Sequence, residues 1–219
     1  MKIFFSRSSR YAALYLKADA SSQVFDLLSR FASTANISLV DPRTGLVNVI
    51  DETGEPIPLS VTEFETRIRR NDEKMTFQIW WNPFDYSDLI IFVKPILAAV
   101  KIHLYMDNQS DNQMQKIADT LKSIFVPLAR EKAVWALIID QLGISAENPW
   151  WDEIVIGRVK LQFPFPQELW LPVDSPCLKS VDKRLCWVTR PDPAVVRLCY
   201  LYLNLPDGSG VYLVEWNNI

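Results

Sequence analysis

The sequence has few of the residues on which most active sites and cofactor sites depend. Its 219 residues include 6 glycines and 1 histidine, whereas glycine at its usual frequency would contribute roughly 15. Few glycines leave little chain for loops that approach a phosphate closely, and one histidine excludes histidine-rich metal sites and most histidine relays. The sequence contains no P-loop, dinucleotide-binding glycine motif or nucleophile elbow. We therefore expect no cofactor, no bound metal and no enzyme activity.

The cysteines, the charges and the apolar runs exclude further classes of protein. Cys177, Cys186 and Cys199 are an odd number without C-x-x-C spacing, which favours reduced, buried thiols over a disulfide or a zinc site. With 23 basic and 26 acidic side chains and no strongly basic segment, we expect no nucleic-acid partner. The apolar runs are too short for a signal peptide or for the roughly 20 residues that span a bilayer. These features predict a cytoplasmic protein that does not enter a membrane.

Three segments have the periodicity of amphipathic helices. Apolar residues recur at helical spacing within 21–35, 60–70 and 111–128, and such a stripe ordinarily faces the core. The second and third segments begin with capping boxes, Ser60 with Glu63 and Ser110 with Gln113, which satisfy backbone amides at the start of a helix. Pro127 should kink or end the third helix, because proline lacks the backbone donor.

Most of the remaining chain has the alternation or the apolar character of strands. Segments 75–81, 88–93 and 100–106 predict an antiparallel meander, and 11–18 predicts a strand that would pair with 2–6. The continuous apolar run 133–139 is typical of a central strand. Prolines divide the C-terminal part into short extended pieces, of which 195–203 and 211–216 are joined by a predicted hairpin turn.

These elements predict an α+β fold with a mainly antiparallel sheet, two or three amphipathic helices and a proline-rich β-hairpin region near the C-terminus. We expect a single domain over 1–219. A helix, a strand, an aspartate and a glycine follow one another twice, ending in Asp41 with Gly45 and in Asp140 with Gly143. Two β-β-α-β halves, 1–73 and 74–145, with an extension over 146–219, would explain the repeat. Ordinary turn chemistry is the alternative, because aspartate caps turns and glycine accepts positive φ.

Asp41, Asp140 and His103 are the residues to which catalysis would be assigned. Both aspartates end predicted strands, where α/β enzymes often place catalytic acids. A carboxylate pair assisted by a divalent metal is therefore the competing function. However, Asp41 precedes Pro42, which favours a turn-capping role. His103 lies between apolar residues of a predicted strand, which favours a satisfied sheet histidine over a general base.

Large aromatic residues are over-represented, and the sequence has 8 tryptophans. Trp80 and Trp81 are neighbours on a predicted strand, where their side chains point to opposite faces. Trp150 and Trp151 follow a proline in a predicted loop. Tryptophan and tyrosine are enriched at the centres of protein–protein interfaces, and nearby acids would set orientation and association rate. The alternative is that both faces of the sheet are covered and the rings are buried. The candidate partner interface comprises Trp80, Trp81, Phe84, Asp85, Tyr86, Trp150, Trp151, Asp152 and Glu153.

Two stretches within 25–155 share short motifs with a known group of proteins. In the first, a helix and an apolar strand lead to Asp41-Pro42-Arg43-Thr44-Gly45; in the second, Asp140-Gln141-Leu142-Gly143 is followed by Trp150-Trp151-Asp152. These segments resemble the D-P-Q-x-G, D-x-x-G and W-D elements of bacterial immunity proteins linked to polymorphic toxins, with Arg43 in place of the usual glutamine.

The resemblance implies a protein that binds a cognate toxin and neutralises it, and it supplies no catalytic residues. A structural or assembly subunit is a further alternative. The sequence leaves the oligomeric state open.

Overall fold

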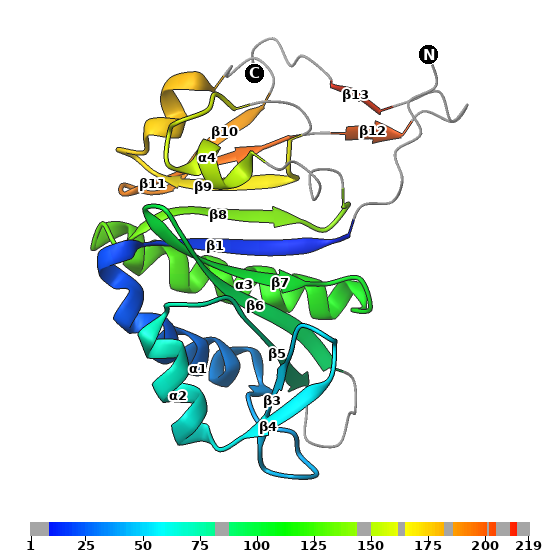
Figure 1. Cartoon of the computed structure of the whole chain (residues 1–219). Coiled ribbons are helices and arrows are strands. Elements are labelled where there is room, and N and C mark those ends of the chain that lie inside the picture. The colour runs from blue at the N-terminus through cyan, green and yellow to red at the C-terminus, as the bar shows by residue number, and fades with distance from the viewer. Residues whose placement is uncertain are drawn as a thin grey trace.

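The computed structural model describes residues 9–81, 88–143, 150–161, 165–181 and 186–200, and the backbone of two short strands at 202–204 and 211–213. The fold is α+β: an antiparallel sheet of 11 strands runs through the described part, and helices lie against it (Figure 1). In the described ranges, no helix combines the length and the apolar character that a bilayer crossing requires.

Thirteen strands and six helical segments make up the described chain. The strands are β1 (Tyr11–Lys17), β2 (Ile37–Ser38), β3 (Val47–Ile50), β4 (Pro56–Leu59), β5 (Met75–Trp81), β6 (Asp88–Ile96), β7 (Ala99–Tyr105), β8 (Val134–Asp140), β9 (Glu168–Pro172), β10 (Trp187–Asp192), β11 (Val195–Cys199), β12 (Tyr202–Asn204) and β13 (Val211–Leu213). The helices are α1 (Val24–Ala35), α2 (Val61–Arg70), α3 (Asp111–Arg130) and α4 (Trp151–Val155), and the 3₁₀ helices are η1 (Ala18–Gln23) and η2 (Pro176–Ser180).

The large sheet has the order β10-β11-β9-β8-β1-β7-β6-β5-β3-β4, with β2 paired to β5, while β12 and β13 form a separate hairpin. The chain begins this sheet in its middle, at β1, between β7 and β8 (Figure 1). The predicted meander is confirmed as β5, β6 and β7, and the predicted central strand is confirmed as β8.

Different elements cover the two faces of the sheet. On one face, strand residues such as Leu14, Phe77 and Leu137 form a core with α1, α2 and α3. On the opposite face, Tyr15 of β1 and Trp151 of α4 belong to a second core, which extends over β8, β9 and β11 to η2. Alternate residues of one strand therefore enter different cores. Beyond α4, several residues of β6 and β5 on this second face are only half-buried.

The three predicted helices are confirmed, and both capping boxes are present at Ser60 and Ser110. Of the two outcomes predicted for Pro127, an end of the helix is excluded, because α3 continues to Arg130, while a kink stays a prediction. Leu128 and Ala129, just beyond the proline, are buried. Their packing against the sheet stabilises a turn that proline alone would disfavour.

The C-terminal part differs most from the sequence-based prediction. The segment predicted as one strand over 195–203 is divided between β11, which pairs with β9 and β10, and β12, which pairs with β13. Residues 151–155, predicted as loop, form α4. The predicted pairing of 11–18 with 2–6 is wrong, because β1 pairs with β7 on one edge and with β8 on the other. Residues 2–6 themselves and the turn 205–210 lie outside the described residues.

The two repeated turns contain the predicted chemistry. The amides of Gly45 and Gly143 donate to the carbonyls of Asp41 and Asp140, over 2.8 and 3.4 Å. Both glycines have positive φ, 71° and 67°, a conformation that glycine adopts without a Cβ penalty. The alternative of ordinary turn chemistry thus accounts for both glycines, and the two-half organisation stays a prediction.

Candidate functional site

The pair Trp80 and Trp81 is buried on opposite faces of β5. Trp81 is 6% exposed in the first core, and its indole nitrogen donates to the buried amide oxygen of Gln109. Trp80 is 5% exposed on the other face, where the guanidinium carbon of Arg43 lies 5.4 Å from the ring centroid. The expectation that these rings offer contact surface is therefore corrected. Both side chains are buried, one on each face of the sheet, which is the alternative stated above.

The pair Trp150 and Trp151 is divided between surface and core. Trp151 is 3% exposed and packs in the second core, whereas Trp150, at the N-terminus of α4, is 51% exposed. Consecutive residues at the start of a helix point in directions about 100° apart, so that one can enter the core while the other remains outside. Among the four paired tryptophans, Trp150 is the one that reaches the surface.

The predicted acidic residues next to this pair have internal partners. Asp152 accepts hydrogen bonds from Lys101 Nζ and from the Tyr15 hydroxyl, each over 3.0 Å. Burial raises the pKa of Tyr15 well above its ordinary value, and the Asp152 carboxylate raises it further. Glu153 lies 3.8 Å from Arg158 in a more exposed ion pair. Asp152 thus fastens α4 to the sheet. The sequence pattern predicted instead that it would orient a partner protein. The candidates Phe84, Asp85 and Tyr86 lie outside the described residues.

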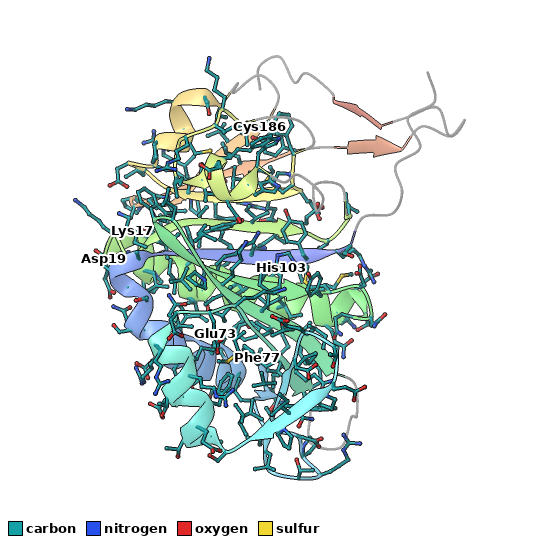
Figure 2. The ribbon with its side chains drawn as sticks, viewed as in Figure 1. Lys17, Asp19, Glu73, Phe77, His103 and Cys186 are labelled. Carbon is teal, nitrogen blue, oxygen red and sulfur yellow. The ribbon has the colours of Figure 1, made fainter. Side chains whose placement is uncertain are left out.

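A row of aromatic side chains crosses the second face of the sheet beside α4. We call it the aromatic face; it consists of Tyr11, Phe92, His103 and Tyr105. His103 stacks between Tyr11 and Phe92, with centroid distances of 4.8 and 4.6 Å and interplanar angles of 2° and 9°. Tyr105 is tilted against His103 and is 37% exposed. Figure 2 shows His103 near the middle of the sheet, beside β1.

The strand register creates this row. Phe92 and His103 are direct partners in β6 and β7, and Tyr105 pairs with Tyr11 across β7 and β1. Neighbouring strands are about 4.8 Å apart, which matches the ring separations, so that the parallel rings stand upright on the sheet. The sequence contained the signal, because 90, 92, 94 and 101, 103, 105 alternate with apolar core positions. The pairing that joins these positions became visible only in the structure.

His103 has the properties of a structural histidine. It is 7% exposed, and neither ring nitrogen has a hydrogen-bond partner within the part of the chain that the structure describes. Burial, with Lys101 and Lys74 nearby, lowers its pKa to about 3. The ring is therefore neutral near pH 7, and among the described residues the contacts that hold it are stacking contacts. The predicted location in a sheet is confirmed, while the predicted satisfaction of its polar atoms is not.

Asp41 has the turn-capping role that its sequence context favoured. Its carboxylate accepts from the backbone amide, Nε and Nη2 of Arg43 over 2.8, 3.0 and 2.7 Å, and from Asn48 over 3.3 Å. Hydrogen bonding from Arg43 lowers the pKa of Asp41 to about 2. Arg43, which departs from the motif of the resembled proteins, thus links the turn to the ring of Trp80.

The structure does not bring Asp41 and Asp140 together as a catalytic pair. Asp140 ends β8, whereas Asp41 follows β2, and β1, β7, β6 and β5 lie between these two strands in the sheet. At about 4.8 Å for each strand, the separation is on the order of 20 Å. The two carboxylates cannot therefore share a proton or a metal ion.

The described residues contain no group of three or more His, Cys, Asp or Glu side chains placed to hold a metal ion. All three cysteines are free thiols. Cys177 is buried, and burial raises its pKa to about 12, as predicted for a reduced thiol that acts as a small apolar side chain. The prediction of burial is wrong for Cys186 and Cys199, which are partly exposed.

A cleft of about 750 Å³ opens where β1 begins and α3 starts, and Arg10 and Asp107 of its lining are hydrogen-bonded to each other. The Arg10 backbone amide donates to Asp107 over 2.7 Å, and its guanidinium donates to the Asp107 carbonyl. Gln115 donates to Asp119 over 2.8 Å. This cleft shows no pairing of a nucleophile with a base among its described lining residues.

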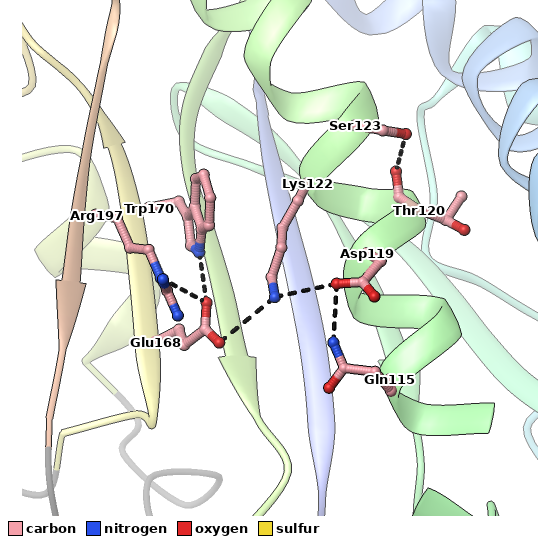
Figure 3. Close-up of polar contacts among 8 residues, drawn as sticks. All are labelled: Gln115, Asp119, Thr120, Lys122, Ser123, Glu168, Trp170 and Arg197. Atoms are coloured by element: carbon pink, nitrogen blue, oxygen red, sulfur yellow. Dashed lines mark hydrogen bonds and ion pairs between the residues drawn. The ribbon is translucent and has the colours of Figure 1, made fainter. Parts of the chain in front are cut away.

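A polar cluster fastens α3 to the strands of the C-terminal part (Figure 3). Glu168 of β9 accepts from Trp170 Nε1 over 2.8 Å and from Arg197 Nε over 3.0 Å, and its other oxygen lies 3.5 Å from Lys122 of α3. Lys122 also contacts Asp119 at 3.3 Å. The cluster satisfies its own charges across three elements, which is the arrangement expected of a structural network.

Comparison with protein-family models, with curated proteins and with solved structures finds no match to this chain.

Proposed function

We propose that this chain is an immunity-type protein, which binds a cognate bacterial toxin through a protein–protein interface and neutralises it. The observation that carries the proposal is the half-exposed Trp150 on a helix whose other large side chains are buried. The motif resemblance described above supports the same class. Tryptophan is the side chain most often found at the energetic centre of such interfaces.

The surroundings of Trp150 hold it in place before any partner arrives. Trp151, Ile154 and Val155 of α4 are buried, and Asp152 fastens the helix to β7 through Lys101. Binding of a partner would therefore not need to order α4, and the loss of conformational entropy on binding would be smaller than for a flexible loop.

Trp150 alone cannot supply a stable interface, which buries about 800 Å² on each partner. The neighbouring aromatic face can extend the contact. The Lys101–Asp152 ion pair joins α4 to that face, because the Lys101 ammonium lies 5.3 Å from the Tyr15 ring and 6.0 Å from the Phe92 ring. We propose that the toxin contacts α4 and the adjoining open part of the sheet together.

The proposal predicts that a toxin is encoded beside this chain's gene, and that toxin supplies the test. Coexpression with this protein should restore growth of cells that produce the toxin, and calorimetry should show a direct complex. Trp150→Ala should weaken binding by about 2 kcal/mol or more while leaving the thermal unfolding temperature nearly unchanged. Absence of both protection and binding would reject the immunity function.

A matched control separates the loss of a contact residue from the general loss of exposed apolar surface. Val173 is 46% exposed at the end of β9, and Val173→Ala should leave affinity unchanged. If Val173→Ala and Trp150→Ala weakened the complex equally, the assignment of Trp150 to the interface would be incorrect.

A further inference from the structure

Three lysines lie beside one another on the open face of the sheet. Lys94 of β6 is the register partner of Lys101 in β7. Lys74 directly precedes Met75, the register partner of Val93, which places it beside Lys94. We call Lys74, Lys94 and Lys101 the lysine row. Like charges directly opposite each other on neighbouring strands are destabilising, so this row has a free-energy cost that packing does not explain.

The usual structural reason for lysines on a sheet does not apply here. Lysine on an edge strand prevents pairing with another chain, but β6 and β7 are interior strands. Of the three ammonium groups, Lys101 has a carboxylate partner, Asp152. Lys74 and Lys94 are exposed and form no ion pair within the described ranges. Among the described residues, the row therefore presents two lysines without an ion-pair partner, in a protein whose net charge is −3.

The lysine row adjoins the aromatic face. Lys74 Nζ lies 5.1 Å from the centroid of the Phe92 ring, and Lys101 Nζ lies 6.0 Å from it. Within the stack, Tyr11 and His103 are buried, whereas Phe92 is half-buried. Exposed ammonium groups beside the half-buried Phe92 favour a ligand that combines carboxylates with apolar side chains.

We infer that the lysine row and the aromatic face form a docking surface for a carboxylate-rich segment of the partner protein. This inference rests on the proposed function and specifies the chemistry of the toxin's contact surface. Carboxylates of the partner pair with Lys74 and Lys94, and its apolar side chains cover the half-buried Ile90 and Phe92. A single-stranded nucleic acid fits less well, because its bases stack on exposed ring faces. Here Tyr11 and His103 are buried, and Phe92 stacks on His103 and faces the ammonium group of Lys74.

The surface is tested first without the toxin. Fluorescence anisotropy measures binding of a labelled peptide that alternates glutamate and phenylalanine, and of a labelled single-stranded oligonucleotide with the same net charge. The peptide should bind more tightly than the oligonucleotide. The double variant Lys74→Glu/Lys94→Glu should weaken peptide binding by about tenfold or more.

The control reverses the same number of charges on the helix-covered side. Arg70 in α2 and Lys116 in α3 are exposed, and Arg70→Glu/Lys116→Glu should leave peptide affinity nearly unchanged. Equal losses in both double variants, absence of peptide binding, or preferential binding of the oligonucleotide would each overturn the inference. Self-association of the protein that Lys74→Glu/Lys94→Glu abolishes would also overturn it, because the face would then contact a second copy.

The toxin complex distinguishes failure of this inference from failure of the proposed function. If the toxin binds the wild type and Lys74→Glu/Lys94→Glu with equal affinity, the immunity function stands and the docking surface is rejected. If the toxin binds neither protein, the immunity function is rejected, while the peptide measurement still decides whether the face binds carboxylate-rich chains.

Discussion

Lys101 of the central sheet and Asp152 of α4 form an ion pair with 3.0 Å between Nζ and Oδ1. The two side chains are 15% and 28% exposed, and the same carboxylate oxygen accepts from the hydroxyl of the buried Tyr15. The contact holds α4 against the second core, next to the half-buried residues of β5 and β6. Loss of this contact would therefore change both the stability of α4 and the position of the proposed interface residues on it.

Asp152→Ala should destabilise the protein by about 1–3 kcal/mol, because it leaves Lys101 and the Tyr15 hydroxyl without a partly buried acceptor. Chemical denaturation measures the change. Glu153→Ala is the matched control on the same helix. Its ion pair with Arg158 spans 3.8 Å between exposed groups, so we expect a change of about 0.5 kcal/mol or less. Equal effects would show that the Asp152 contacts do not hold α4.

Trp151→Ala should cost about 3–5 kcal/mol of folding stability, since it removes a large side chain from a packed core. Trp150→Ala, one residue earlier, should change stability by less than about 1 kcal/mol. Thermal and denaturant unfolding compare the two variants directly. The opposite order would mean that Trp150 contributes to the core and Trp151 does not.

Gly157→Ala should be strongly destabilising, by about 3 kcal/mol or more. Its φ is +79°, and a Cβ would lie 2.6 Å from Cβ and 2.8 Å from Cγ of Pro176. Gly54→Ala isolates the backbone contribution, because φ there is +90° and no atom lies within 4 Å of the added Cβ. That variant should lose about 1–2 kcal/mol. Similar losses at both positions would exclude the contact with Pro176 as a cause.

His103→Phe should reduce the loss of stability on acidification. The folded-state pKa of His103 is about 3, against an ordinary value of 6.5. Above pH 6.5 the ring is neutral in both states and has no effect on the pH dependence. As the pH falls from 6.5 towards 3, the unfolded chain binds a proton that the folded chain excludes. Stability then falls by up to about 1.4 kcal/mol per pH unit.

Chemical denaturation of the wild type and of His103→Phe between pH 5 and pH 7 measures this contribution. Over this range the unfolded wild-type chain takes up on the order of one proton more than the folded chain. The sequence has 1 histidine, His103. The difference between the two proteins in the slope of unfolding free energy against pH therefore reports on this ring. Tyr105→Phe serves as the control, because it changes the aromatic face and retains the histidine. A wild-type slope that His103→Phe leaves unchanged would show that the ring is protonated in the folded state.

Local patterns predicted much of the fold. The capping boxes at Ser60 and Ser110 marked helix starts correctly, because the serine side chain and the third helical residue satisfy each other's amides within one turn. Segments 75–81, 88–93 and 100–106 predicted the meander, since alternation along a strand is a local property. The helix α4 and the continuation of α3 beyond Pro127 were not predicted, for the opposite reason. Whether a segment becomes helical there depends on what it packs against, which the sequence nearby does not contain.

The candidate site was less predictable. Exposure of Trp150 and burial of Trp151 depend on the orientation of α4 against the second core. The aromatic face needs the register between β1, β7 and β6. A shift of one residue in any of these strands would have moved that strand's rings to the helix-covered side.

The sequence by itself determined the fold class, the principal helices, the turn role of Asp41 and the scarcity of residues for catalysis, because composition and short-range periodicity decide these properties. Only the tertiary structure decided which aromatic side chains reach the surface and that Lys74, Lys94 and Lys101 adjoin one another. Their positions follow from strand order and register, which depend on contacts between segments distant in the chain and on the free energy of burying both faces of one sheet.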